Sequence, residues 1–146
     1  MSVEARLALV ASPRTFFQND TQRADLDDPA TTQTGLIALL TELVAKGHNI
    51  EFTAIKSDHH DDSNLGEHCH FNGYCADLWP LASETGGNYL DAGDPRFAAF
   101  LRDVDASQWT YQIGLAGTAW TSANAVAAGD SVFHDDGADH VHIGAR

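Results

Sequence analysis

The sequence has few basic residues. Eight Lys and Arg stand against 21 Asp and Glu, which gives a formal net charge of -13 at pH 7. Recognition of phosphate needs clustered Lys and Arg, so this balance argues against nucleic acid as the main partner. It also argues against electrostatic docking on anionic membranes or anionic wall polymers. The acidic surface is best explained as a source of solubility.

The first residues lack the marks of an export signal or a membrane anchor. Glu4 stands where a signal peptide carries positive charge, and the apolar run Leu7–Ala11 is too short for a signal core or for crossing a bilayer. We therefore expect no membrane partner and a protein made in the cytoplasm without a signal peptide. It would reach any external target through lysis or inside a virion.

Cysteine is also scarce. Cys69 and Cys75 are the only two, and they lie close together in the sequence. Two cysteines do not suggest a disulfide framework, so we expect free thiols in a reducing compartment. They could pair only if the local turn brought their Cα atoms to about 5.5 Å. No G-x-S-x-G, P-loop or dinucleotide motif is present, which argues against serine hydrolases, nucleotidases and Rossmann enzymes.

What is present indicates one folded domain over residues 1–146, since 43% of the residues are hydrophobic. The run 34–46 carries leucines at the helical period, with Thr34 as its expected cap and Gly47 as its expected end. Asp94-Pro95 predicts the start of a second helix, because Asp caps helices and proline favours their first position. Residues 12–33 show no sustained period and are expected to form a loop.

Alternating or short apolar segments predict several strands. Leu7–Ala11 is expected to be a short buried strand or a helix start, and the segment Asp77–Trp79 is expected to end at Pro80. A turn at residues 135–137 is expected to join the last two strands, and His134 and Asp135 are expected to belong to it. The expected strands are 50–56, 111–115, 131–133 and 140–143. This order predicts an α+β fold with a small antiparallel sheet flanked by helices.

The histidines are clustered. Seven of the eight fall within residues 59–70 and 134–142. In a strand, side chains alternate, so His140 and His142 must share a face while Val141 and Ile143 point into the core. Gly73 permits a tight bend that can bring His70 and Asp77 to the same site. The sequence therefore predicts one cleft lined by imidazoles and a carboxylate.

These side chains are the ligands that zinc takes. His70, Asp77 and His142 would supply three, leaving the fourth position open as hydrolysis requires. A water bound there has a pKa near about 7 and becomes a usable nucleophile. Its proton needs a base within hydrogen-bond reach. His140 and Asp139 are both candidates, and the strand alternation favours His140.

The same residues resemble a known family. They are similar to the zinc metallopeptidases that share the lysostaphin, D-alanyl-D-alanine carboxypeptidase and hedgehog fold. The nearest branch, the D-Ala-D-Ala carboxypeptidases and L,D-endopeptidases, carries S-x-H-x-x-G-x-A-x-D and a late E-x-x-H or H-x-H. His70, Gly73 and Asp77 match the first motif, and His140-Val141-His142 matches the second. The resemblance implies a peptidoglycan peptidase, such as a phage endolysin, that uses Zn²⁺ and binds wall peptides.

The match is incomplete. His68 replaces the serine of the motif, Cys75 replaces its alanine, and Asp139 replaces the glutamate. Lys56 stands where the family often has an arginine that holds a substrate carboxylate, and a lysine would bind it as a point charge. The resemblance covers roughly residues 48–80 and 131–144.

Other interpretations remain beside the peptidase. A second interpretation is a structural or virion tail module that kept the fold and a structural metal but does no chemistry. A zinc hydrolase acting on another small substrate is a third interpretation. The polar loop with His59 and His60 is interpreted as solvated, and His68 as solvated or as a partner of a metal ligand.

Overall fold

The computed structural model describes residues 3–58, 69, 70, 72–115, 132–135 and 140–146. Within these residues, four helices accompany a sheet of six strands. The helices are α1 (Val3–Ala11), α2 (Asp20–Asp27), α3 (Thr34–Ala45) and α4 (Pro95–Ala106). The strands are β1 (Thr15–Phe17), β2 (Asn49–Ala54), β3 (Cys75–Leu81), β4 (Thr110–Leu115), β5 (Val132–Asp135) and β6 (Val141–Ala145).

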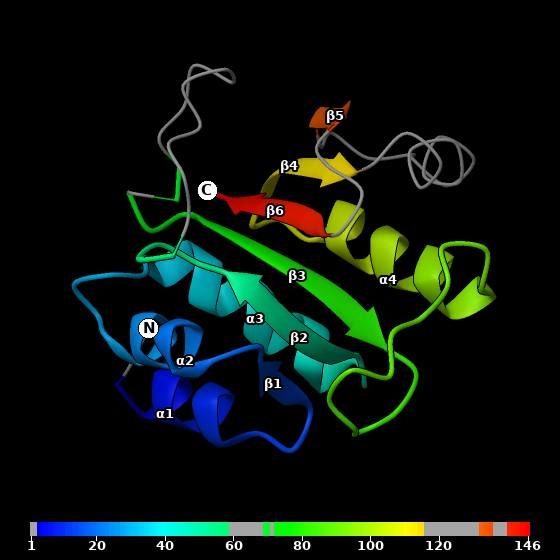
Figure 1. Ribbon diagram of the computed structural model, residues 1–146. Helices are drawn as coiled ribbons and strands as arrows, with labels where there is room; N and C mark the ends of the chain where they lie inside the picture. The colour runs from blue at the N-terminus through cyan, green and yellow to red at the C-terminus, as the bar shows by residue number, and fades with distance from the viewer. Residues whose placement is uncertain (1–2, 59–68, 71, 116–131, 136–139) are drawn as a thin grey trace.

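The sheet has the order β1-β2-β3-β6-β4-β5, so β6 lies between β3 and β4 (Figure 1). The central pairs are antiparallel, but β1 pairs with β2 and β4 pairs with β5 in parallel. The α+β class is therefore confirmed, whereas the prediction of an antiparallel sheet is wrong at both edges, where the sheet is mixed. The parallel pairs arise because α3 lies in the chain between β1 and β2 and a long connection separates β4 from β5.

The two faces of the central strands differ in character. Figure 1 shows α3 and α4 behind the sheet. Alternate residues of the central strands belong to the hydrophobic core and are fully buried. Among them are Leu78, Ile113, Val141 and Ile143. The residues between them are polar or small and lie on the opposite face, which carries the candidate site. The predicted orientation of Val141 and Ile143 is confirmed.

Both helices predicted from periodicity and capping signals are present. Asp94 caps α4 by accepting a hydrogen bond from the Arg96 N–H, and Pro95 is its first residue. The N-cap of α3 is Gln33, which makes no side-chain cap bond, so the prediction of Thr34 as the cap is wrong by one residue. Gly47 follows α3 with φ of 92°, the left-handed geometry expected there.

The prediction of a loop over residues 12–33 is wrong, because this segment forms β1 and α2. Asn19 and Gln22 form a capping box that starts α2. The buried guanidinium of Arg6 then donates to the carbonyl groups of Leu26 and Thr32. Burial lowers the pKa of Arg6, although nearby carboxylates oppose this. Arg6 lies outside the segment in the sequence, so the local pattern does not reveal this contact, whereas the capping box is a local signal of α2.

Smaller corrections concern three other segments. Leu7–Ala11 is part of α1, and Leu7 is exposed. Strand β3 continues through Pro80 to Leu81, since Pro80 lies beyond Leu78, the last β3 residue paired with β6. His134 and Asp135 belong to β5 and not to a turn. Among the described residues, no helix is long and apolar enough to span a membrane.

Candidate metal centre

Three neighbouring strands bring the site residues together. Asp77 on β3 lies directly opposite His142 on β6, and His142 lies opposite Gly114 on β4. Because residues two apart share a face, Cys75 and Gln112 lie on the same face as Asp77 and His142. The insertion of β6 between β3 and β4 therefore positions this polar face.

His70 reaches the same face through a tight turn before β3. Gly73 has φ of 81°, and its N–H donates to the His70 carbonyl at 3.1 Å. A Cβ atom at Gly73 would lie 2.4 Å from the Thr31 carbonyl oxygen, so a side chain there has no room. The predicted role of Gly73 in bending the chain is confirmed.

The ring of His70 is oriented by a backbone carbonyl. Its Nδ1 lies 2.6 Å from the oxygen of Ile55, and a carbonyl oxygen can only accept a hydrogen bond. Nδ1 therefore carries the proton, and in the neutral ring Nε2 presents its lone pair to the site. A histidine that binds a metal typically donates its other N–H in this way.

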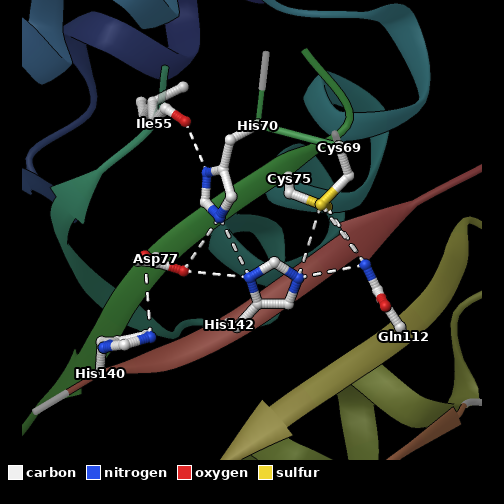
Figure 2. The surroundings of a disulfide bond; sticks show 8 residues. All are labelled: Ile55, Cys69, His70, Cys75, Asp77, Gln112, His140 and His142. Carbon is white, nitrogen blue, oxygen red and sulfur yellow. Dashed lines mark hydrogen bonds and ion pairs between the residues drawn. A yellow bond between two sulfur atoms is a disulfide. The ribbon is translucent and has the colours of Figure 1, made fainter. Parts of the chain in front are cut away.

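Three potential ligand atoms converge in front of β3 and β6 (Figure 2). His142 Nδ1 lies 3.1 Å from His70 Nε2 and 3.1 Å from Asp77 Oδ1. His70 Nε2 lies 3.3 Å from Asp77 Oδ1, which closes the triangle. The three side chains are 1%, 5% and 1% exposed in the order His70, Asp77 and His142.

The size of this triangle fits a tetrahedral metal ion. Ligand atoms about 2.0–2.1 Å from a tetrahedral zinc lie about 3.3–3.4 Å from one another, close to the separations seen here. One proton on His142 Nδ1 can bridge to Asp77 or to His70, but a cation at the centre would satisfy all three atoms at once. His70, Asp77 and His142 are thus a buried group that can hold a metal ion.

His140 lies beside the second oxygen of the shared carboxylate. Its Nε2 is 3.7 Å from Asp77 Oδ2, and its side chain is 17% exposed. The prediction that His140 and His142 share a face is confirmed, since both rings meet Asp77 (Figure 2). Asp139, the other candidate base, lies outside the described residues, as do His59, His60 and His68.

Lys56, the predicted substrate-binding residue, directly follows the carbonyl that orients His70. It is half-buried, and its backbone N–H donates to Asp25 Oδ2 at 3.0 Å. The backbone N–H and hydroxyl of Ser57 also donate to the Asp25 carboxylate. Helix α2 thereby holds the turn that follows β2, and with it the carbonyl of Ile55.

The expectation of free thiols is wrong: Cys69 and Cys75 form a disulfide beside the site. Their Cα atoms are 5.3 Å apart, which is within the range that a disulfide needs. The turn through Gly73 produces this proximity, because Tyr74 N–H donates to the Cys69 carbonyl at 2.9 Å. The number and spacing of the two cysteines do not reveal this proximity, because it depends on the fold of the turn.

Gln112 is a further site residue that the sequence did not reveal. Its side-chain nitrogen lies 3.2 Å from His142 Nε2, on the opposite side of the ring from Asp77. As placed, the amide donates to the Nε2 lone pair, and rotating the amide by half a turn would present its oxygen to an Nε2–H instead. Gln112 can therefore support His142 with either nitrogen protonated.

Gly144 makes room for this arrangement. It pairs with Cys75 on one side and with Gln112 on the other. A Cβ atom at Gly144 would lie 2.5 Å from Gln112 Cγ and 3.0 Å from Cys75 Sγ. Any side chain at this position would displace one of its two neighbours.

Comparison with known proteins gives no family for this chain. Scans against protein-family models, the curated proteins and the solved structures found no match.

Proposed function

We propose that this protein is a zinc-dependent hydrolase whose metal is held by His70, Asp77 and His142. The observation that carries the proposal is the triangle of Nε2, Oδ1 and Nδ1 atoms, with edges of 3.1, 3.1 and 3.3 Å. Two imidazoles and one carboxylate form a donor set that suits zinc. Three protein ligands leave one tetrahedral position for water or substrate, which is the pattern of catalytic zinc sites.

When bound, zinc supplies a Lewis acid that polarises a carbonyl group and lowers the pKa of water to about 7. The two carboxylate oxygens of Asp77 have different neighbours. Oδ1 is one of the three ligand atoms, and Oδ2 lies 3.7 Å from His140 Nε2. His140 is the most exposed of the four side chains at 17%. We assign it the role of taking the proton from the attacking water and passing it to the leaving amine.

The proposed substrate class is the peptide of peptidoglycan. The support is the spacing of His70, Gly73 and Asp77 together with the pair His140 and His142, which resembles the carboxypeptidase and endopeptidase branch of the hedgehog/DD-peptidase fold. Lys56 would hold a substrate carboxylate. It follows Ile55, whose carbonyl orients His70, so its backbone is tied to the centre.

Metal content and wall hydrolysis test this proposal together. Purified protein reloaded with zinc and desalted should contain about one zinc per chain by mass spectrometry, and should release peptides or new amino groups from purified sacculi. His142→Ala should lose both, because it removes one of the three ligand atoms of the triangle. The matched control is His48→Ala, since His48 pairs with Asp103 at 2.6 Å outside the centre. A protein that binds no zinc after reloading would refute the proposal.

A second candidate is a structural metal in a module that does no chemistry. The observation that favours it is burial, because the three ligand side chains are at most 5% exposed and closed sites are typical of structural zinc. In that case chelation should lower the melting temperature, since metal binding contributes to folding. Sacculi and soluble muropeptides would remain uncut by the zinc-loaded protein. Turnover lost in His140→Gln with zinc retained would exclude this second function.

A further inference from the structure

The second ring nitrogen of His142 faces a different set of atoms. While Nδ1 points to His70 and Asp77, Nε2 points to the disulfide and Gln112 (Figure 2). Cys69 Sγ lies 3.7 Å from His142 Nε2. The ring of His142 thus lies between His70 and Asp77 on one side and the disulfide on the other.

One of these sulfur atoms, Cys69 Sγ, lies at the distance from His142 that two ligands of one metal ion would have. With Zn–S of about 2.3 Å and Zn–N of about 2.0–2.1 Å, a sulfur and a nitrogen on one tetrahedral ion lie about 3.6 Å apart. The observed separation of 3.7 Å matches this value. Cys69, Cys75 and His142 are all buried and offer ligand atoms within 4.8 Å of one another.

The side chain of Gln112 would also stabilise thiolates at the two cysteines. The Gln112 amide nitrogen lies 3.4 Å from Cys69 Sγ and 3.5 Å from Cys75 Sγ, so it can donate to either sulfur. Because Gly144 has no side chain, the space beside Cys75 stays open for the sulfur and the amide. Hydrogen bonds to a thiolate favour its charged form, which is the form that binds metals.

We propose that reduction of the Cys69–Cys75 disulfide opens a second metal site, made of both thiolates and His142 Nε2, that binds soft divalent ions. A phosphine or dithiol reductant supplies two electrons, the S–S bond breaks, and two thiols form as the reductant is oxidised. Binding of a divalent ion then releases both thiol protons to solvent. This site needs neither His70 nor Asp77, so it does not rest on the proposed hydrolase.

The two sites compete for His142. A neutral imidazole has one lone pair, because its other nitrogen carries the proton. An ion bound at Nε2 places the proton on Nδ1 and removes that atom from the triangle with His70 and Asp77. Reduction therefore transfers His142 from an oxygen- and nitrogen-rich site to a sulfur-rich site.

Cobalt spectroscopy tests this proposal without any measurement of activity. Protein is reduced with tris(2-carboxyethyl)phosphine, desalted without air, and titrated with Co²⁺, whose thiolate complexes show charge-transfer absorption in the near ultraviolet. The reduced protein should develop this band at one cobalt per chain, and the oxidised protein should not. His70→Ala should keep the band, Cys69→Ser with Cys75→Ser should abolish it, and His142→Ala should weaken cobalt binding at least tenfold.

Two controls separate the site from a bare dithiol. Reduced protein alkylated with N-ethylmaleimide should give no band, and far-ultraviolet circular dichroism reports whether the reduced chain stays folded. Equal cobalt affinity in reduced wild type and reduced His142→Ala would overturn the proposal, because the thiols would then bind without the imidazole. The absence of a band in reduced wild type would overturn it as well. Zinc stoichiometry of the oxidised protein judges the hydrolase separately.

Discussion

Asp77 and His142 are direct cross-strand partners on β3 and β6, and their Oδ1 and Nδ1 atoms lie 3.1 Å apart. This pairing places a carboxylate and an imidazole on two rigid elements, where strand register fixes their separation. His70 arrives from a turn, but a hydrogen bond from Nδ1 to the Ile55 carbonyl at 2.6 Å fixes its ring. A preorganised triangle of this kind lets a metal bind without large rearrangement.

Replacing Asp77 with Asn should weaken zinc binding at least a hundredfold. The change keeps the size of the side chain but removes the negative charge that faces two imidazoles at 3.1 and 3.3 Å. Competition with a fluorescent zinc chelator measures the affinity. Asp103→Asn, which alters a carboxylate paired with His48, is the control and should bind zinc like the wild type. Unchanged affinity in Asp77→Asn would remove Asp77 from the ligand set.

Replacing His140 with Gln should leave about one zinc per chain while lowering kcat on wall peptides by about 10²–10⁴-fold, the usual contribution of a general base. The reason is that His140 contacts Asp77 Oδ2 at 3.7 Å and lies outside the triangle of ligand atoms. The pH profile of kcat should also lose its acidic limb. A variant that loses its zinc would show instead that His140 is itself a ligand.

Replacing Gln112 with Leu should lower zinc affinity about 10–100-fold, as is typical when the hydrogen-bond partner of a metal ligand is lost. Gln112 lies 3.2 Å from His142 Nε2, and leucine can neither donate nor accept there. Isothermal titration calorimetry of the zinc-free protein measures the change. The control is Gln108→Leu, at an exposed position in the turn before β4, which should leave the affinity unchanged.

Tyr89 provides a prediction about alkaline pH. The hydrogen bond that its hydroxyl donates to Glu51, with smaller effects of burial and of the Glu51 charge, raises the pKa of Tyr89 to about 12. Because the folded pKa exceeds the usual value of 10.0, the contact stabilises fully below pH 10 and is lost as the pH rises through about 12. The stability advantage of wild type over Tyr89→Phe should therefore shrink across this range in urea titrations. The same comparison in a Glu51→Gln background is the control and should show a smaller convergence, because the carboxylate that raises the pKa of Tyr89 is then gone.

Features of the fold with a signal in neighbouring residues could be predicted from the sequence. Asp94-Pro95 started α4 as predicted, and the alternation of His140, Val141, His142 and Ile143 placed the imidazoles on one face and the aliphatic side chains in the core. Such patterns succeed because caps and strand alternation depend only on neighbouring residues. The proximity of His70 to Asp77 and of His140 to His142 was predictable for the same reason, whereas the meeting of the two pairs depends on the pairing of β3 with β6.

Features that depend on distant partners were missed. Helix α2 is held by the buried Arg6 and by the backbone of Lys56, which donates to Asp25, and neither Arg6 nor Lys56 lies within α2. Gln112 reaches His142 only because β6 enters the sheet between β3 and β4. An isolated glutamine in a predicted strand carries no signal of that neighbourhood. The disulfide was missed because the small number of cysteines suggested free thiols. The turn that brings Cys69 and Cys75 together could not be predicted from their number.

The place of β6 in the sheet also links the centre to the completion of the sheet. Strand β6 follows all the other described strands in the chain, yet it fills the position between β3 and β4. Strand β6 alone joins β1-β2-β3 to β4 and β5 in the described sheet, and its pairing with β3 holds His142 beside Asp77. Contacts between residues so far apart in sequence form slowly, because a large loop must close first. Binding of a metal at the centre would therefore report that β6 has taken its place in the sheet.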